Sequence, residues 1–275
     1  MTRHSRASWP PPYTTHTSKL GRKTAMTSNP TRCIVTGGSQ GIGEAIVEKL
    51  LSDGAAVAVI DRQEPTARLK GRVAFAECDV SDSVAMENAA RALADALGGP
   101  PDTVVANAGR CVSGRLASDP VDNLVNHFQI NTLGVLNTFR PHISHMRAAG
   151  GGSLIAITSN CAHKPRLDLG AYCATKAATK MMVECLALEL SAEGIRVNAV
   201  APGSCDTEMQ RRQWEELGVP KDRQVVGDLT SFRSGIPAGR LATPNDIAQA
   251  VGFLASPAAE FMRGVTLVVD GAQSM

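Results

Sequence analysis

The amino-acid sequence predicts an α/β fold in which one doubly wound, parallel sheet of seven strands forms a single domain. Short apolar segments alternate along the chain with amphipathic segments of helical period. Near-continuous apolar strands are typical of parallel sheets that helices cover on both faces. The length of 275 residues, with 43% hydrophobic residues, is sufficient for one such domain and its core.

The expected elements follow each other in regular order from residue 31. Strands are predicted at residues 32–36, 56–61, 72–78, 103–106, 153–158, 195–200 and 265–269. Helices are predicted at about residues 41–53, 83–97, 119–148, 171–192 and 244–255. The long, charged stretch 204–235 interrupts this alternation, and we expect it to be an irregular substrate loop, since long loops in compact domains are usually functional.

A glycine-rich turn, T-G-G-S-Q-G-I-G at residues 36–43, joins the first strand to the first helix. Gly37 permits the tight turn, while Gly41 and Gly43 let the backbone approach a pyrophosphate at the helix N-terminus. The expected cofactor contacts here are Gly37, Ser39, Gln40, Gly41, Ile42 and Gly43. The segment also fits the G-x-S-x-G elbow of hydrolases with Ser39 as the nucleophile, but Ser39 follows the first strand, earlier than that fold places it.

The acid at the end of the second strand, Asp61, favours NAD as the cofactor. A carboxylate at this position can accept hydrogen bonds from both ribose hydroxyls, and its charge repels the 2′-phosphate of NADP. Arg62 could serve a phosphate instead, but Gln40 adds no positive charge to the loop. We therefore expect NAD.

Later strand ends supply further expected cofactor contacts. Asp79 can accept a hydrogen bond from an adenine amino group, although a helix-capping role is equally open. The N-A-G segment at 107–109 is small enough for backbone to lie close to a cofactor. The remaining expected contacts are Arg62, Asp79, Val80, Asn107, Ala108, Gly109, Lys176, Pro202 and Gly203. Asn131 lies inside a predicted helix, an unfavourable place for asparagine that indicates a buried polar role.

Tyr172 and Lys176 are four residues apart and share one face of a predicted helix. An ammonium beside a phenol favours the phenolate and lowers a pKa that is about 10 in water. Tyr172 can then take a proton from an alcohol near neutral pH. Ser159 lies thirteen residues before Tyr172.

Charge and hydropathy exclude other classes of protein. No apolar run approaches the ~20 residues that span a bilayer. Residues 1–30 carry five basic and no acidic residues, which leaves a net charge of −3 on the remaining 245 and no basic surface for nucleic acid. We expect residues 1–30 to be a disordered extension, since they lack the apolar core of a secretory signal, and Met26 could be the true start.

The cysteines and histidines indicate neither disulfides nor a metal. The seven cysteines are odd in number and contain no C-x-x-C pair, so we expect reduced thiols in a cytoplasmic protein. His142 and His145 share a helix face, but no carboxylate or cysteine accompanies them in the sequence. We expect no metal.

Together these motifs resemble the short-chain dehydrogenase/reductase family over residues 31–275, with its Rossmann-like fold. The matching residues are T-G-x-x-x-G-I-G at 36–43, N-A-G at 107–109, Asn131, Ser159, Tyr172, Lys176 and Pro202-Gly203. The resemblance implies that Tyr172 is the base, that Lys176 lowers its pKa and holds the nicotinamide ribose, and that Ser159 binds the reacting oxygen. It also implies that Asn131 anchors a water in a proton relay, and that homo-oligomers, dimers or tetramers, form through the helices near 119–148 and 171–192. The D-G-A at 270–272 departs from the usual D-G-G.

Three segments, 159–166, 202–214 and 235–248, resemble one subgroup of the family. That resemblance implies NAD-dependent oxidation of a ring alcohol in a cyclohexadiene carboxylate, 2,3-dihydro-2,3-dihydroxybenzoate to 2,3-dihydroxybenzoate, in siderophore or secondary-metabolite synthesis. The expected substrate contacts are Ser159, His163, Arg166, Met209 and Gln210. Arg166 could grip the carboxylate bidentately or be a surface arginine.

Other functions remain open. They are oxidation of 2,3-dihydro-3-hydroxyanthranilate, in which an amine replaces one hydroxyl, and a general alcohol dehydrogenase or 3-oxoacyl reductase. A regulator that binds NAD without turnover is disfavoured, because it has no need for Ser159, Tyr172 and Lys176 together.

Overall fold

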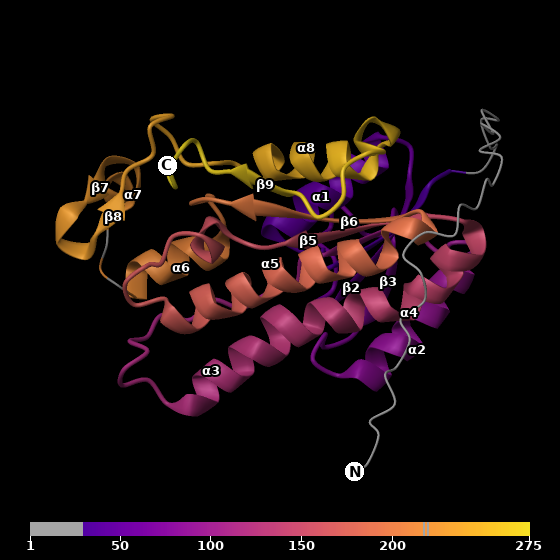
Figure 1. The fold of residues 1–275 in the computed structure, drawn as a ribbon, viewed down its shortest axis with the longest axis horizontal. Coiled ribbons are helices and arrows are strands. Elements are labelled where there is room, and N and C mark those ends of the chain that lie inside the picture. The colour runs from indigo at the N-terminus through magenta and orange to yellow at the C-terminus, as the bar shows by residue number, and fades with distance from the viewer. Residues whose placement is uncertain (1–29, 217, 219) are drawn as a thin grey trace, which may run out of the picture.

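The computed structural model describes residues 30–216, 218 and 220–275, and it forms one seven-stranded parallel sheet between two layers of helices (Figure 1). The strand order is β3-β2-β1-β4-β5-β6-β9. The strands are β1 (Arg32–Thr36), β2 (Ala56–Asp61), β3 (Ala74–Glu77), β4 (Thr103–Ala106), β5 (Gly152–Ile157), β6 (Ile195–Pro202) and β9 (Thr266–Val269). The expected extension lies outside the described residues except for Pro30.

Helices cover both faces of the sheet. The long helices are α1 (Gly41–Ser52), α2 (Ser83–Ala96), α3 (Val121–Phe128), α4 (Gly134–Ala149), α5 (Gly170–Leu190) and α8 (Pro244–Ala255). Figure 1 shows α1 and α8 together on one face, with α2, α4 and α5 on the other. Within the described ranges, no helix is long and apolar enough to cross a membrane.

The side chains of each strand alternate between the two faces of the sheet, and a hydrophobic core forms on each face. Val35 faces α1 and α8, where it packs with residues such as Ile46 and Val251. Its neighbour Ile34 points to the opposite face and packs against α2. Because successive strand residues point to opposite faces, strands buried on both sides are apolar at nearly every position, as the sequence predicts.

The parallel register brings the functional strand ends to one edge. The chain winds outward on both sides of β1, whose neighbours are β2 and β4. Thr36 pairs with Ile60 and with Ala106, so the loops that follow these three strands begin side by side. This reversal of strand order is where doubly wound sheets bind their ligands.

The structure confirms the fold class and the seven predicted strands, with two corrections to the other elements. The predicted helix 119–148 is divided into α3 and α4 by a π-helical segment, Gln129–Leu133. The stretch 204–235 is not irregular: it contains α6 (Glu208–Glu216), α7 (Lys221–Val226) and a small hairpin of β7 (Gly227–Asp228) and β8 (Arg233–Ser234). Short, polar elements of this kind have too little hydrophobic periodicity for the sequence to reveal them.

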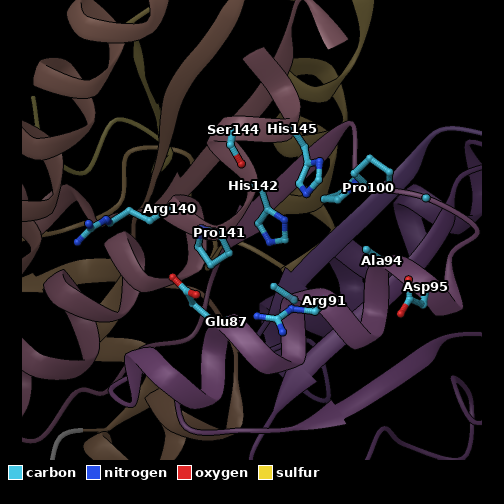
Figure 2. A pocket seen from close by; sticks show the side chains of 13 residues that line it. Glu87, Arg91, Ala94, Asp95, Pro100, Arg140, Pro141, His142, Ser144 and His145 are labelled. Atoms are coloured by element: carbon cyan, nitrogen blue, oxygen red, sulfur yellow. The ribbon is translucent and has the colours of Figure 1, made fainter. Parts of the chain in front are cut away.

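A cavity of about 500 Å³ lies between α2 and α4, and Figure 2 shows His142 there beside Arg91. Its lining includes residues 99–101, which precede β4, so it lies toward the opposite edge of the sheet from the glycine-rich turn. His142 is 3% exposed, and burial, with a smaller effect of His145, lowers its pKa to about 4. In the part of the chain that the structure describes, no group of three histidine, cysteine or acidic residues could hold a metal ion.

The depressed pKa of His142 makes stability depend on pH. Because the unfolded state binds the proton more readily, stability is complete above about pH 6.5 and is lost as pH falls toward 4, by about 3 kcal/mol. Urea unfolding of wild type and His142→Leu at pH 7 and pH 4 should show a smaller pH effect in the variant. His145→Asn, a control at an exposed position of the same helix, should keep most of the effect. An undiminished pH effect in His142→Leu would contradict this prediction.

Candidate active site

The glycine-rich turn presents free backbone donors at the start of α1. Gln40 precedes the helix, and its side chain makes no capping hydrogen bond. Gly37 and Gly41 adopt left-handed φ angles of 65° and 57°, which other residues rarely adopt. A Cβ atom on Gly43 would overlap the carbonyl oxygen of Gly37. The turn is therefore shaped so that an anionic group can approach the helix N-terminus.

Asn107 fixes this turn against the end of β4. Its Nδ2 donates to the carbonyls of Gly37 at 2.8 Å and Thr36 at 3.1 Å. The amide of Ala108 donates to the Thr36 Oγ1 at 3.3 Å. Gly109 follows, and a Cβ atom there would lie 3.5 Å from the Lys176 Nζ. The N-A-G segment thus joins the predicted cofactor turn to the predicted catalytic lysine.

Asp61 lies directly beside the glycine-rich turn. Its carboxylate accepts hydrogen bonds from the amides of Ser39 at 3.0 Å and Gln63 at 3.2 Å. Ser39 is 2% exposed, and its hydroxyl donates to the Gln63 carbonyl at 2.7 Å. A buried hydroxyl engaged in this way does not suit the exposed nucleophile of the hydrolase alternative.

Three other predicted cofactor contacts lie at the same edge of the sheet, just after β2 and β3. They are Arg62, Asp79 and Val80. Arg62 is largely exposed and lies 3.7 Å from the Asp79 carboxylate, which partly compensates its charge. Asp79 also accepts hydrogen bonds from the amide and hydroxyl of Ser81. Val80 is buried, and its carbonyl accepts a hydrogen bond from Asn137 at 2.9 Å.

Tyr172, Lys176 and Ser159 meet where β5 ends. Lys176 is 3% exposed; its Nζ donates to the Ile157 carbonyl at 2.8 Å and lies 5.7 Å from the centre of the Tyr172 ring. Ser159 lies beside Tyr172, and its Oγ accepts a hydrogen bond from the amide of Cys161 at 3.1 Å. The structure thus brings together the three side chains that the sequence predicts to be catalytic.

The pKa of Tyr172 lies in the opposite direction from the sequence-based expectation. Burial raises it well above 10, and the nearby cysteines, Cys111, Cys161 and Cys173, raise it further, while the hydrogen bond with Ser159 lowers it. Burial likewise lowers the pKa of Lys176 to about 8. Desolvation has the largest effect on both groups, and it disfavours the charged form of each.

The side chain of Asn131 is held by hydrogen bonds within the protein. It is fully buried in the π-helical segment, and its Nδ2 donates to the Arg110 carbonyl at 2.8 Å and to the Thr175 Oγ1 at 3.2 Å. Its Oδ1 accepts from the Arg110 amide at 2.7 Å. These bonds engage the amide group and hold the segment after β4 against α5.

The predicted substrate contacts are only partly brought together. Arg166 is half-buried beside the Cys161 thiol, whereas His163 is exposed. Met209 is 47% exposed on α6. Gln210 donates to Gln213 at 2.8 Å, so its amide is engaged within α6.

The sequence placed Cys161 and Cys173 near the active site, whereas Cys111, Gln213 and Arg233 were not anticipated there. Cys111, Cys161 and Cys173 pack around Tyr172 with Leu169, and Gln213 of α6 donates to the Cys111 sulfur at 3.1 Å. Arg233 of the hairpin also lies near Cys161. Gln213 and Arg233 belong to the segment that was expected to be irregular, so no helix or strand period marked them.

The C-terminal turn packs against the end of β6 and against the segment that follows Ser159. Pro202 ends β6, and a Cβ atom on Gly203 would lie 2.5 Å from that of Asp270. The Gln273 Oε1 accepts from the Asn160 Nδ2 at 3.1 Å and from the Ser204 amide at 3.2 Å. Asn160 also donates to Asp270. This buried network joins the residue after Ser159 to the C-terminal turn.

The similarity of the chain to known proteins shows the family to which it belongs. The family model described as enoyl-(acyl carrier protein) reductase matches residues 37–272, and the chain belongs to the short-chain dehydrogenase/reductase family. It is an oxidoreductase of the class that acts on CH–OH donors with a nicotinamide cofactor.

Two dehydrogenases and one reductase are similar to the chain over most of its length. The chain is 36% identical to 2,3-dihydro-2,3-dihydroxybenzoate dehydrogenase of Bacillus subtilis over 88% of this chain and 95% of the relative. It is 35% identical to the vibriobactin-specific 2,3-dihydro-2,3-dihydroxybenzoate dehydrogenase of Vibrio cholerae over 89% and 96%. Its structure is similar to 3-ketoacyl-(acyl-carrier-protein) reductase from Brucella melitensis complexed with NADH, with a TM-score of 0.78 and 27% identity over 90% of this chain and 99% of that one.

The D-G-A departure has a measurable consequence. Ala272 occupies the position of the usual second glycine and adopts a left-handed φ of 69°. A Cβ atom disfavours this conformation, so Ala272→Gly should raise the free energy of unfolding by about 1 kcal/mol.

Urea denaturation measures this effect. The same exchange in α8, Ala250→Gly, is the control, and it should lower stability by about 1 kcal/mol because that alanine is helical. A loss of stability in both variants would rule out strain at Ala272.

Proposed function

We propose that this oxidoreductase uses NAD⁺ to oxidise a ring alcohol of a cyclohexadiene carboxylate, with 2,3-dihydro-2,3-dihydroxybenzoate as substrate and 2,3-dihydroxybenzoate as product. The observation that carries this proposal is a half-buried guanidinium, Arg166, placed at the same site as Ser159 and Tyr172. Relatives with this activity, identical at 35–36% of positions over nearly their whole length, support the same substrate.

The residues at the strand ends fit a nicotinamide dinucleotide. The uncapped N-terminus of α1 offers amide donors to a pyrophosphate, and the absence of side chains at Gly37 and Gly43 leaves room for close approach. Asp61 is positioned for a ribose, and Lys176 lies beside Gly109 for the second ribose. When bound, the nicotinamide supplies the hydride acceptor.

The side chains at the end of β5 supply the proton chemistry. Ser159 hydrogen-bonds the reacting hydroxyl and orients it toward Tyr172. The Tyr172 phenolate takes the hydroxyl proton while the carbon loses its hydride, and a ketone results. The charge of Lys176 stabilises the phenolate against the cost of burial. The ketone then tautomerises to an aromatic diol, which makes the overall oxidation effectively irreversible.

We further propose NAD⁺ rather than NADP⁺. The Asp61 carboxylate lies where a ribose 2′-substituent would be expected, and a phosphate there would meet a like charge. Arg62, a nearby cation that could compensate, lies close to Asp79.

The assembly and location are also proposals. Pairing of subunits through α4 and α5 would cover the exposed apolar side chains of Met181 and Leu188. All seven cysteines are free thiols, which favours the reducing cytoplasm.

Absorbance at the NADH band tests the activity directly. The full chain should form NADH from NAD⁺ and 2,3-dihydro-2,3-dihydroxybenzoate, and Tyr172→Phe should reduce kcat at least about 100-fold because the proton acceptor is lost. Ser39→Ala, which tests the hydrolase alternative, should keep most of kcat and lose activity only through a higher KM for NAD⁺, because Ser39 is an expected cofactor contact. Turnover of the 3-amino analogue alone, or of neither compound, would refute the substrate assignment.

Cofactor choice is tested at Asp61. Asp61→Ser removes the charge that disfavours a 2′-phosphate and one ribose acceptor. It should raise the KM for NAD⁺ and increase the ratio of kcat/KM for NADP⁺ to that for NAD⁺ at least about tenfold. Glu64→Ser, which removes an exposed acid three residues further on, should leave that ratio unchanged. An unchanged ratio in Asp61→Ser would mean that Asp61 does not select the cofactor.

A further inference from the structure

Arg233 is a half-buried cation with few protein partners. It begins β8, and its Nη1 donates to the Oε1 of the fully buried Gln224. Across the described ranges, no carboxylate lies within ion-pair distance of either Arg233 or Arg166, whereas most other half-exposed arginines of this region, such as Arg211 and Arg223, have one. An arginine that is partly desolvated without an anion is unfavourable, which indicates that its partner is a ligand.

A chain of hydrogen bonds places the hairpin next to the proposed active site. Ser234, the residue after Arg233, donates from its hydroxyl to the Gln273 carbonyl at 2.6 Å. The side chain of the same Gln273 accepts from Asn160 at 3.1 Å. Asn160 lies between Ser159 and Cys161 in the sequence. Arg233 is therefore linked through Ser234 and Gln273 to Asn160, the residue after Ser159, although it is more than sixty positions away in the sequence.

The backbone before Arg233 is held in an unusual conformation. Phe232 has a left-handed φ of 52°, which is rare for a bulky residue, and its side chain is 87% exposed. This conformation ends the preceding turn and sends the chain into β8, with the arginine rather than the aromatic ring toward the protein. Backbone strain of this kind persists where the surrounding structure enforces it.

Arg166 and Arg233 lie near the same thiol, that of Cys161, but belong to different segments of the chain. Arg166 comes from the segment between β5 and α5, and Arg233 comes from the hairpin after α7. Burial lowers the pKa of Arg233, and the positive charge of Arg166 lowers it further, so the two guanidinium groups repel each other. Both groups also act on the Cys161 thiol, the neighbour of Asn160.

The acid of the same hairpin offsets this repulsion only in part, since it raises the pKa of Arg233 less than burial and Arg166 lower it. Asp228 lies on the same hairpin, but its carboxylate accepts hydrogen bonds from Thr230 and Ser231 and lies 3.9 Å from Arg223. The two guanidinium groups therefore remain available for one anion between them. A planar carboxylate matches the fork geometry of arginine better than a point charge does.

We propose that Arg233 and Arg166 together form the binding site for the carboxylate of the substrate, so that the β7–β8 hairpin selects acidic ring alcohols over neutral ones. This inference rests on the proposed function and deepens it. Its consequence is that the hairpin, rather than Met209 or Gln210 of α6, determines substrate class. The carboxylate also removes the repulsion between the two arginines and so holds the hairpin against the segment after β5.

Equilibrium binding without turnover tests this site. Binding of 2,3-dihydroxybenzoate and of its neutral counterpart, catechol, to the full chain saturated with NAD⁺ should be compared by calorimetry. Arg233→Ala should weaken binding of the acid about 10- to 100-fold and binding of catechol less than about twofold. Arg233→Lys, which keeps the charge but not the fork, should fall between wild type and Arg233→Ala. Arg212→Ala, which removes an exposed arginine of α6 that pairs with Glu208, is the matched control and should change neither affinity.

Two further comparisons distinguish failure of the proposed carboxylate site from failure of the proposed reaction. If Arg166→Ala and Arg233→Ala each weaken the acid, the double variant should lose less than the two single losses combined, because the groups share one ligand. Equal weakening of the acid and of catechol in Arg233→Ala, or no weakening of either, would overturn the proposal. If the dihydrodiol is not oxidised but the difference between acid and catechol is found, the proposed reaction fails while the carboxylate site stands.

Discussion

The hydrogen bonds from Asn107 to the carbonyls of Thr36 and Gly37 are the contacts on which the site depends most. They join the loops after β1 and β4 at the point where the strand order reverses. The close packing of Gly43 on Gly37 leaves no room for a side chain, so α1 begins in one fixed position. The direction of α1 in turn determines where its free amide groups point. A cofactor bound there has its orientation determined before any side chain contacts the substrate.

Burial of Lys176 and Tyr172 in this rigid site has an electrostatic cost. Lys176 and Tyr172 both lie in a desolvated environment, where burial disfavours the charged form of each. Burial lowers the pKa of Lys176 to about 8 and raises that of Tyr172, so it opposes the ammonium–phenolate pair that the proposed proton transfer requires. The hydrogen bond from Lys176 to the Ile157 carbonyl and the network around Asn131 hold these groups in place. Positioning therefore matters here as much as the pKa values.

The hairpin that carries Arg233, one half of the proposed carboxylate site, belongs to a different part of the molecule from the groups assigned to the chemistry. Ser159, Tyr172 and Lys176 are carried by β5 and α5, which are anchored in the core. Arg233, Gln213 and Met209 are carried by the segment between β6 and α8, whose helices and hairpin are short. This separation lets one rigid site act on different alcohols when the covering segment changes, which is how a fold comes to support many functions.

The sequence alone determined the layered fold and most of the local motifs. Apolar periodicity gave the seven strands, and fixed spacings gave the glycine-rich turn, Asp61 and the Tyr172–Lys176 pair, because these features depend on residues close together in the chain. The interruption at residues 129–133, the elements within 204–235 and the direction of the Tyr172 pKa could not be obtained in this way. They depend on burial and on contacts between distant segments. Tertiary structure alone joined Ser234, the neighbour of Arg233, to Asn160 through Gln273, since that approach is produced by packing at the end of the sheet and leaves no periodic pattern in the sequence.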